Sequence, residues 1–73
     1  MATHPETIYL HLESSPDHFI SKINKKIGTD IRDKSRLIPI TWNQYKKLQN
    51  DPEVVMEDLF IKNGRWIAEI ALM

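Results

Sequence analysis

The sequence predicts a small α+β domain in which a mainly antiparallel sheet carries two helices on one face. In two segments, residues that favour the start of a helix are followed by apolar residues at helical spacing. An Asn-Gly pair joins two apolar runs near the carboxyl end. The length of 73 residues allows one domain, which we assign to residues 1–73. The predicted order is strand, helix, strand, helix, strand, strand, with the last two strands forming a β-hairpin.

A strand is predicted over residues 6–13, because apolar and polar residues alternate there. Ile8, Leu10 and Leu12 point to one side, and the residues between them point to the other. A period of two is typical of a strand with one buried face.

The first helix is predicted over residues 16–27. Ser15 is expected to cap its amino end, Pro16 suits the first helical position, and Gly28 favours a left-handed end. The stripe that we expect to face the core consists of Phe19, Ile20, Ile23 and Ile27.

A short strand and a second helix follow the charged segment after Gly28. Residues 37–40 are apolar, but Pro39 cannot donate to a ladder, so this segment is expected at a sheet edge. Thr41 and Gln44 have the spacing of a capping box at the start of a helix that ends near Asn50. The aromatic residues expected to pack this helix on the hairpin are Trp42, Tyr45 and Trp66.

The hairpin prediction depends on the Asn63-Gly64 turn between residues 54–61 and 66–72. Both turn residues tolerate positive φ, which a type I′ turn requires, and this turn fixes the register of the two strands. One face then pairs Ile61 with Trp66, Leu59 with Ala68, Glu57 with Ile70 and Val55 with Leu72. We expect that face in the core, since it is almost entirely apolar.

The opposite face of the hairpin is the first candidate site. An apolar pair, Phe60 and Ile67, lies beside two opposed acids there, and opposed like charges destabilise a sheet. An aromatic side chain ringed by charge is typical of a protein interface, although a helix that covers Phe60 and Ile67 is the alternative. The candidate protein-interaction residues are Met56, Asp58, Phe60, Ile67 and Glu69.

No residue pattern points to catalysis, a metal or a cofactor. His4, His11 and His18 recur every seven residues, but they fall on a tail, a strand and a helix, whereas a zinc site needs three or four converging ligands. The chain has no cysteine, its serines lie in no nucleophile motif, and both glycines are explained by turns. We therefore expect no enzyme and no cofactor.

A nucleic-acid interface is the second candidate, because residues 22–47 hold eight of the ten basic side chains. The hairpin tip also resembles the basic wing of winged-helix proteins, although the third helix of that fold is missing. The candidate residues are Lys22, Lys25, Lys26, Arg32, Lys34, Arg36, Lys62 and Arg65. A solvated surface with compensated charge is the alternative, since the net charge is zero.

Taken together, these features favour a non-enzymatic protein-interaction module of the regulator, inhibitor or adaptor type. The size and layout are similar to those of small phage-encoded regulators, although no motif assigns a family. We expect another protein as the partner. We also expect a cytoplasmic location, since residues 1–15 show no signal-peptide pattern and no apolar run is long enough for a membrane span. Edge-to-edge pairing of the C-terminal strand with a second copy, giving a homodimer, is a further expectation.

Overall fold

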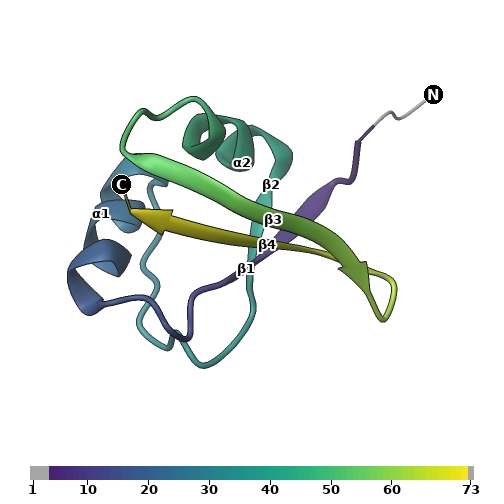
Figure 1. Ribbon diagram of the computed structural model, residues 1–73, viewed down its shortest axis with the longest axis horizontal. Helices are drawn as coiled ribbons and strands as arrows, with labels where there is room; N and C mark the ends of the chain where they lie inside the picture. Colours follow the sequence, from purple (N-terminus) through teal and green to yellow (C-terminus); the bar gives the residue numbers. More distant parts are fainter. Residues whose placement is uncertain (1–3, 73) are drawn as a thin grey trace.

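The computed structural model describes residues 4–72 and confirms the predicted order of elements. Figure 1 shows the helices gathered towards one end of the molecule and a long hairpin that extends past them. The elements are β1 (Thr7–His11), α1 (Asp17–Ile27), β2 (Ile38–Thr41), α2 (Trp42–Gln49), β3 (Val54–Lys62) and β4 (Arg65–Leu72).

The four strands form one mixed sheet in the order β2-β1-β4-β3. β1 runs antiparallel to β2 and parallel to β4, and β3 and β4 form the antiparallel hairpin. The C-terminal strand is therefore an interior strand, so the free edge beside the hairpin belongs to β3 and not to β4.

The core lies between the sheet and the two helices. Ile8 and Leu10 of β1 and Ala68 of β4 are fully buried, and they share one hydrophobic cluster with Phe19 of α1 and Leu48 of α2. Burial of each large aliphatic or aromatic side chain stabilises the fold by roughly 1.5–3 kcal/mol. Both helices therefore pack on the same face of the sheet, as predicted.

The ends of α1 differ in part from the prediction. Pro16, and not Ser15, is the N-cap residue, and no side chain caps the amino end of the helix. Gly28 adopts the expected left-handed conformation at the carboxyl end, with φ of 70°. Beyond it, the Asn24 side chain accepts hydrogen bonds from the Ile31 N–H and the Thr29 hydroxyl and donates one to the Ile31 carbonyl, which fixes the following loop.

The start of α2 confirms the capping box. The Gln44 N–H donates to Thr41 Oγ1 over 3.2 Å, and the Thr41 N–H donates to Gln44 Oε1 over 2.9 Å. Gln44 Nε2 also donates to the Ile27 carbonyl over 3.1 Å, which joins the amino end of α2 to the carboxyl end of α1.

The hairpin turn and the register next to it are also confirmed. Asn63 and Gly64 have φ values of 53° and 76°, as a type I′ turn requires. The observed pairs nearest the turn are Lys62 with Arg65, Ile61 with Trp66, Phe60 with Ile67, Leu59 with Ala68 and Asp58 with Glu69.

The rest of the predicted register is wrong, because β3 contains a β-bulge between Met56 and Asp58. Glu57 is the extra residue, so the next pairs are Met56 with Ile70, Val55 with Ala71 and Val54 with Leu72. The bulge keeps the Glu57 carboxylate in solvent and turns Val54 and Met56 towards the core. A regular ladder would instead have placed Glu57 opposite Ile70 on the core face.

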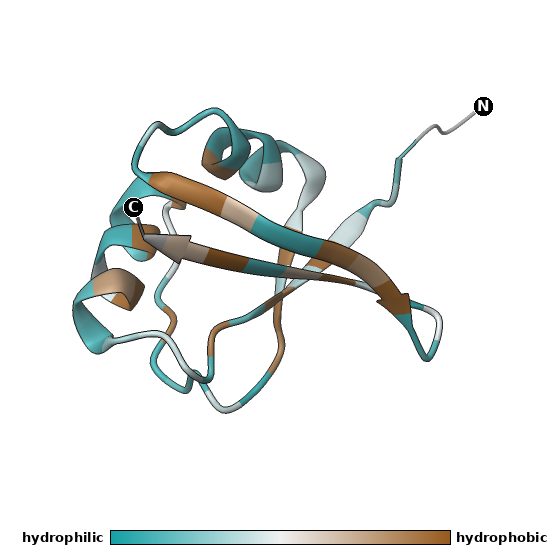
Figure 2. Ribbon diagram, viewed as in Figure 1, coloured by the Kyte–Doolittle hydropathy of each residue, from teal (hydrophilic) through white to brown (hydrophobic). Residues whose placement is uncertain are grey.

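The end of the hairpin extends beyond the helices, so part of its predicted core face is exposed. Leu59 and Ile61 lie on the helix side but keep 37% and 60% of their surface accessible. Figure 2 shows hydrophobic residues in two stretches of β3, one beside the helices and one near the turn, with a hydrophilic stretch between them.

Candidate functional site

The face of the sheet opposite the helices carries most of the predicted interaction residues. The register places Asp58 and Phe60 of β3 beside Ile67 and Glu69 of β4. It also brings two residues of β1 into line, because Tyr9 pairs with Ile67 and His11 with Glu69. We call these six residues, Tyr9, His11, Asp58, Phe60, Ile67 and Glu69, the helix-free face. Met56 is not part of it, since the bulge turns this side chain towards the core.

An apolar row crosses the centre of the helix-free face. Phe60, Ile67, Tyr9 and Pro39 occupy successive positions across the four strands. Ile67 is only 5% exposed, although the helices pack on the other side of the sheet. Phe60 and Tyr9 are half-buried on either side of it. The alternative interpretation, in which a helix covers Phe60 and Ile67, is therefore wrong for residues 4–72.

The acidic part of the face is organised by a histidine. His11 Nδ1 lies 3.3 Å from Glu69 Oε2, and His11 Nε2 lies 3.7 Å from Glu13 Oε2. Asp58, directly opposite Glu69, accepts a hydrogen bond from the Leu59 N–H over 2.9 Å. The two opposed carboxylates are thus each provided with a different donor, which reduces the penalty for placing like charges side by side.

The turn end of the face is basic. Lys62 and Arg65 form the last pair before the turn, and the Arg65 guanidinium lies 5.2 Å from the centre of the Tyr9 ring. This cation–π contact extends the apolar row towards the positive end. A charge gradient therefore runs along the strands, from Lys62 and Arg65 to Asp58 and Glu69.

A hollow of about 470 Å³ lies over this face. Its lining combines apolar side chains with polar and charged groups. The lining residues are His11, Leu37, Phe60, Lys62, Asn63, Arg65 and Ile67. A shallow site of this composition suits an apolar side chain flanked by charge.

The histidines have separate surroundings. His4 stacks on Trp42 with ring centres 4.5 Å apart, His11 lies on β1, and His18 is exposed on α1. Within residues 4–72, no group of three or more histidine and acidic side chains is arranged to hold a metal ion. Of the aromatic residues predicted to pack α2 on the hairpin, Trp42 stacks on buried Tyr45, and Trp42 and Trp66 both pack against the hydrophobic cluster.

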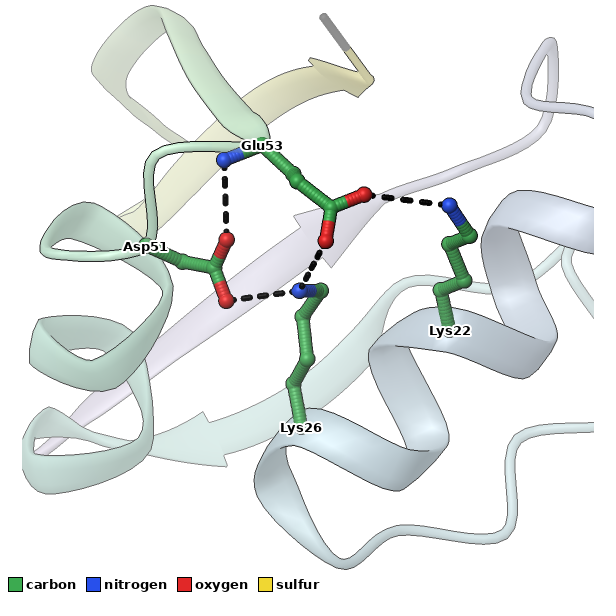
Figure 3. Close-up of polar contacts among 4 residues, drawn as sticks. All are labelled: Lys22, Lys26, Asp51 and Glu53. Carbon is green, nitrogen blue, oxygen red and sulfur yellow. Dashed lines mark hydrogen bonds and ion pairs between the residues drawn. The ribbon is translucent and has the colours of Figure 1, made fainter.

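Several candidate nucleic-acid residues are engaged in ion pairs. Lys26 Nζ lies 2.6 Å from Asp51 Oδ2 and 3.4 Å from Glu53 Oε1, and Lys22 Nζ lies 3.0 Å from Glu53 Oε2 (Figure 3). The hydrogen bond from Lys26 lowers the pKa of Asp51, and the bond from Lys22 lowers the pKa of Glu53. These contacts link α1 to the segment between α2 and β3.

The other basic candidates do not all lie on one part of the surface, although Arg32 and Arg36 line a common hollow. Lys34 donates to the Ser15 carbonyl over 2.8 Å and lies 3.4 Å from Asp17, and Arg32 lies 3.0 Å from Asp30. Lys25 and Arg36 are exposed. The last two candidates, Lys62 and Arg65, lie at the hairpin turn, at the far end of the longest axis from α1 (Figure 1).

Comparison of the chain with protein-family models, with curated proteins and with solved structures finds no match. Among the described residues, no helix has both the length and the hydrophobicity to cross a membrane.

Proposed function

We propose that this protein is a non-enzymatic interaction module of the regulator, inhibitor or adaptor type, which binds another protein through its helix-free face. The observation that carries the proposal is a hollow on the side of the sheet away from the helices, lined by apolar side chains together with Lys62 and Arg65, next to the opposed carboxylates of Asp58 and Glu69. An aromatic and aliphatic centre with a charged margin is the usual composition of a protein-binding hot spot. A cytoplasmic location is part of this proposal.

The charge gradient defines the chemistry of the partner. The proposed partner presents an apolar side chain to Phe60 and Ile67. It places an acidic group towards Lys62 and Arg65, and a basic group towards the opposed carboxylates. Charge complementarity of this kind fixes orientation and accelerates association more than it adds affinity.

Nucleic-acid binding is supported less well by the arrangement of the basic side chains. Lys22, Lys26 and Lys34 already contact carboxylates, and the turn pair is distant from α1. A protein that neutralises several phosphates needs several cations on one surface.

The experiment is affinity capture from a cell lysate with the wild-type protein and two matched variants, with and without nuclease. Phe60→Asp places a carboxylate on the helix-free face. Ile61→Asp places the same group one residue along β3, at a side chain that is 60% exposed on the opposite side. We expect a protein that survives nuclease treatment and is retained by Ile61→Asp but lost with Phe60→Asp.

Two results would contradict the proposal. Equal capture by both variants would show that the helix-free face does not bind the partner. Recovery of nucleic acid alone, abolished by nuclease, would favour the basic residues instead. Circular dichroism of both variants confirms that each is folded before capture.

A further inference from the structure

The two edges of the sheet differ in their capacity to accept another strand. At one edge, β2 spans only Ile38–Thr41 and contains Pro39, which has no N–H to donate. At the other edge, β3 spans Val54–Lys62, with exposed Leu59 and Ile61. A long, apolar edge strand is the part of a sheet most prone to pair with another chain.

The regular part of this edge has a defined centre. The bulge at Glu57 interrupts the ladder on one side and the turn at Asn63 ends it on the other, which leaves residues 58–62. Phe60 is the middle residue of this segment.

The backbone of Leu59 and Ile61 faces the free edge. In a two-residue hairpin the pair next to the turn, here Lys62 and Arg65, exchanges both backbone hydrogen bonds, and such pairs alternate along the ladder. Leu59 and Ile61 fall at the alternate positions. The Leu59 N–H accordingly donates to the Asp58 carboxylate and not to β4.

We propose that β3 pairs antiparallel with β3 of a second copy, about a two-fold axis at Phe60. This register joins the two sheets into one. It places Leu59 opposite Ile61 of the second copy, with both backbones turned towards each other, and Asp58 opposite its Lys62. On the helix side, four exposed aliphatic side chains cover one another. On the other side, two Phe60 rings meet between two ion pairs.

The charges favour this register over its neighbours. Within the hairpin, both charged residues of the regular segment 58–62 face like charges, Asp58 opposite Glu69 and Lys62 opposite Arg65. Of these registers, only the one centred on Phe60 places a residue of opposite charge in the second copy across from Asp58 and across from Lys62. An axis at Leu59 would place Asp58 opposite Phe60, and an axis at Ile61 would place Lys62 opposite Phe60. Charges on an edge strand usually prevent pairing, but here they are self-complementary.

The test uses two charge-reversal variants, Asp58→Lys and Lys62→Asp, and measures by sedimentation velocity how each associates alone and in an equimolar mixture. The wild type is expected to form dimers with a dissociation constant on the order of 10–1000 μM, because the interface is small. Each variant alone places like charges across the axis twice, so its dissociation constant is expected to rise by about tenfold or more. An equimolar mixture restores both ion pairs and is expected to form a heterodimer.

The stability of the variants separates this effect from unfolding. Each substitution replaces a like-charge pair inside the hairpin by an opposite-charge pair, so each isolated variant is expected to melt at or above the wild-type temperature. A wild-type protein that stays monomeric at 1 mM, a variant that dimerises like the wild type, or a mixture that does not associate would each overturn the proposal. The measurement uses the purified protein alone, so its outcome is independent of the proposed partner.

Discussion

Deletion of Glu57 is expected to leave the fold nearly unchanged, although it removes a residue from the interior of a strand. The observed pairs on either side of the bulge are Met56 with Ile70 and Asp58 with Glu69. Those partners are already consecutive in β4, so the deletion converts the bulge into a regular ladder without turning any other side chain to the opposite face. We expect the free energy of unfolding to change by less than about 1 kcal/mol.

Deletion of Val55 is the matched control. Val55 pairs with Ala71 on the other side of the bulge from the turn, so its loss moves Val54 to the opposite face of the sheet. Val54 is only 7% exposed, and removal of a buried valine from the core costs about 2–3 kcal/mol. The deletion of Val55 is therefore expected to be clearly destabilising, whereas the deletion of Glu57 is not.

Urea unfolding, followed by circular dichroism at low micromolar concentration, compares the two deletions. The midpoint and the slope of the transition together give the free energy of unfolding. If deletion of Glu57 lowers the free energy of unfolding by about 2 kcal/mol or more, as much as deletion of Val55, the bulge does not determine which face of the sheet each β3 side chain occupies.

Three further predictions concern the contacts that hold the helices. Lys26→Gln is expected to weaken the acid dependence of stability, because Lys26 lowers the pKa of Asp51 from its ordinary value of 3.8. In the wild type, the stabilisation by this ion pair is present above about pH 4 and is lost as the pH falls through the lowered pKa of Asp51. Melting temperatures measured between pH 2 and 7 should therefore drop less for the variant than for the wild type. Thr41→Ala removes the capping box and is expected to cost about 1 kcal/mol in urea unfolding, and no change would contradict its role. Asn24→Ala leaves the Ile31 N–H and carbonyl without their partner and is expected to cost about 1–3 kcal/mol, with faster amide exchange in the loop after α1.

Much of the fold could be predicted from the sequence because its signals are local. Asn63 and Gly64 define the turn, and the register is correct for every pair up to Asp58 and Glu69. The bulge was missed because it depends on competition between two faces: Glu57 avoids the core only if one residue of β3 is left unpaired. No short-range sequence pattern indicates that competition, although Glu57 is the one acid on the otherwise apolar predicted core face of the hairpin.

The candidate site was predicted in part for a similar reason. Asp58, Phe60, Ile67 and Glu69 share a face because they belong to one hairpin. Tyr9 and His11, the two residues of the helix-free face that belong to β1, were not predicted, since a parallel pairing of β1 with β4 joins segments far apart in the chain. The alternation in β1 already indicated that both residues point away from the core, but not which strand would lie beside them.

The most direct test of the proposed function is site-specific photo-crosslinking in cells. A photoreactive phenylalanine analogue at position 60 lies on the helix-free face, and the same analogue at position 61 lies on the helix side of the strand. The proposal predicts that position 60 yields a crosslink to a second protein species and that position 61 yields none to that protein. Crosslinks to the same protein from both positions, or from position 61 alone, would contradict binding through the helix-free face.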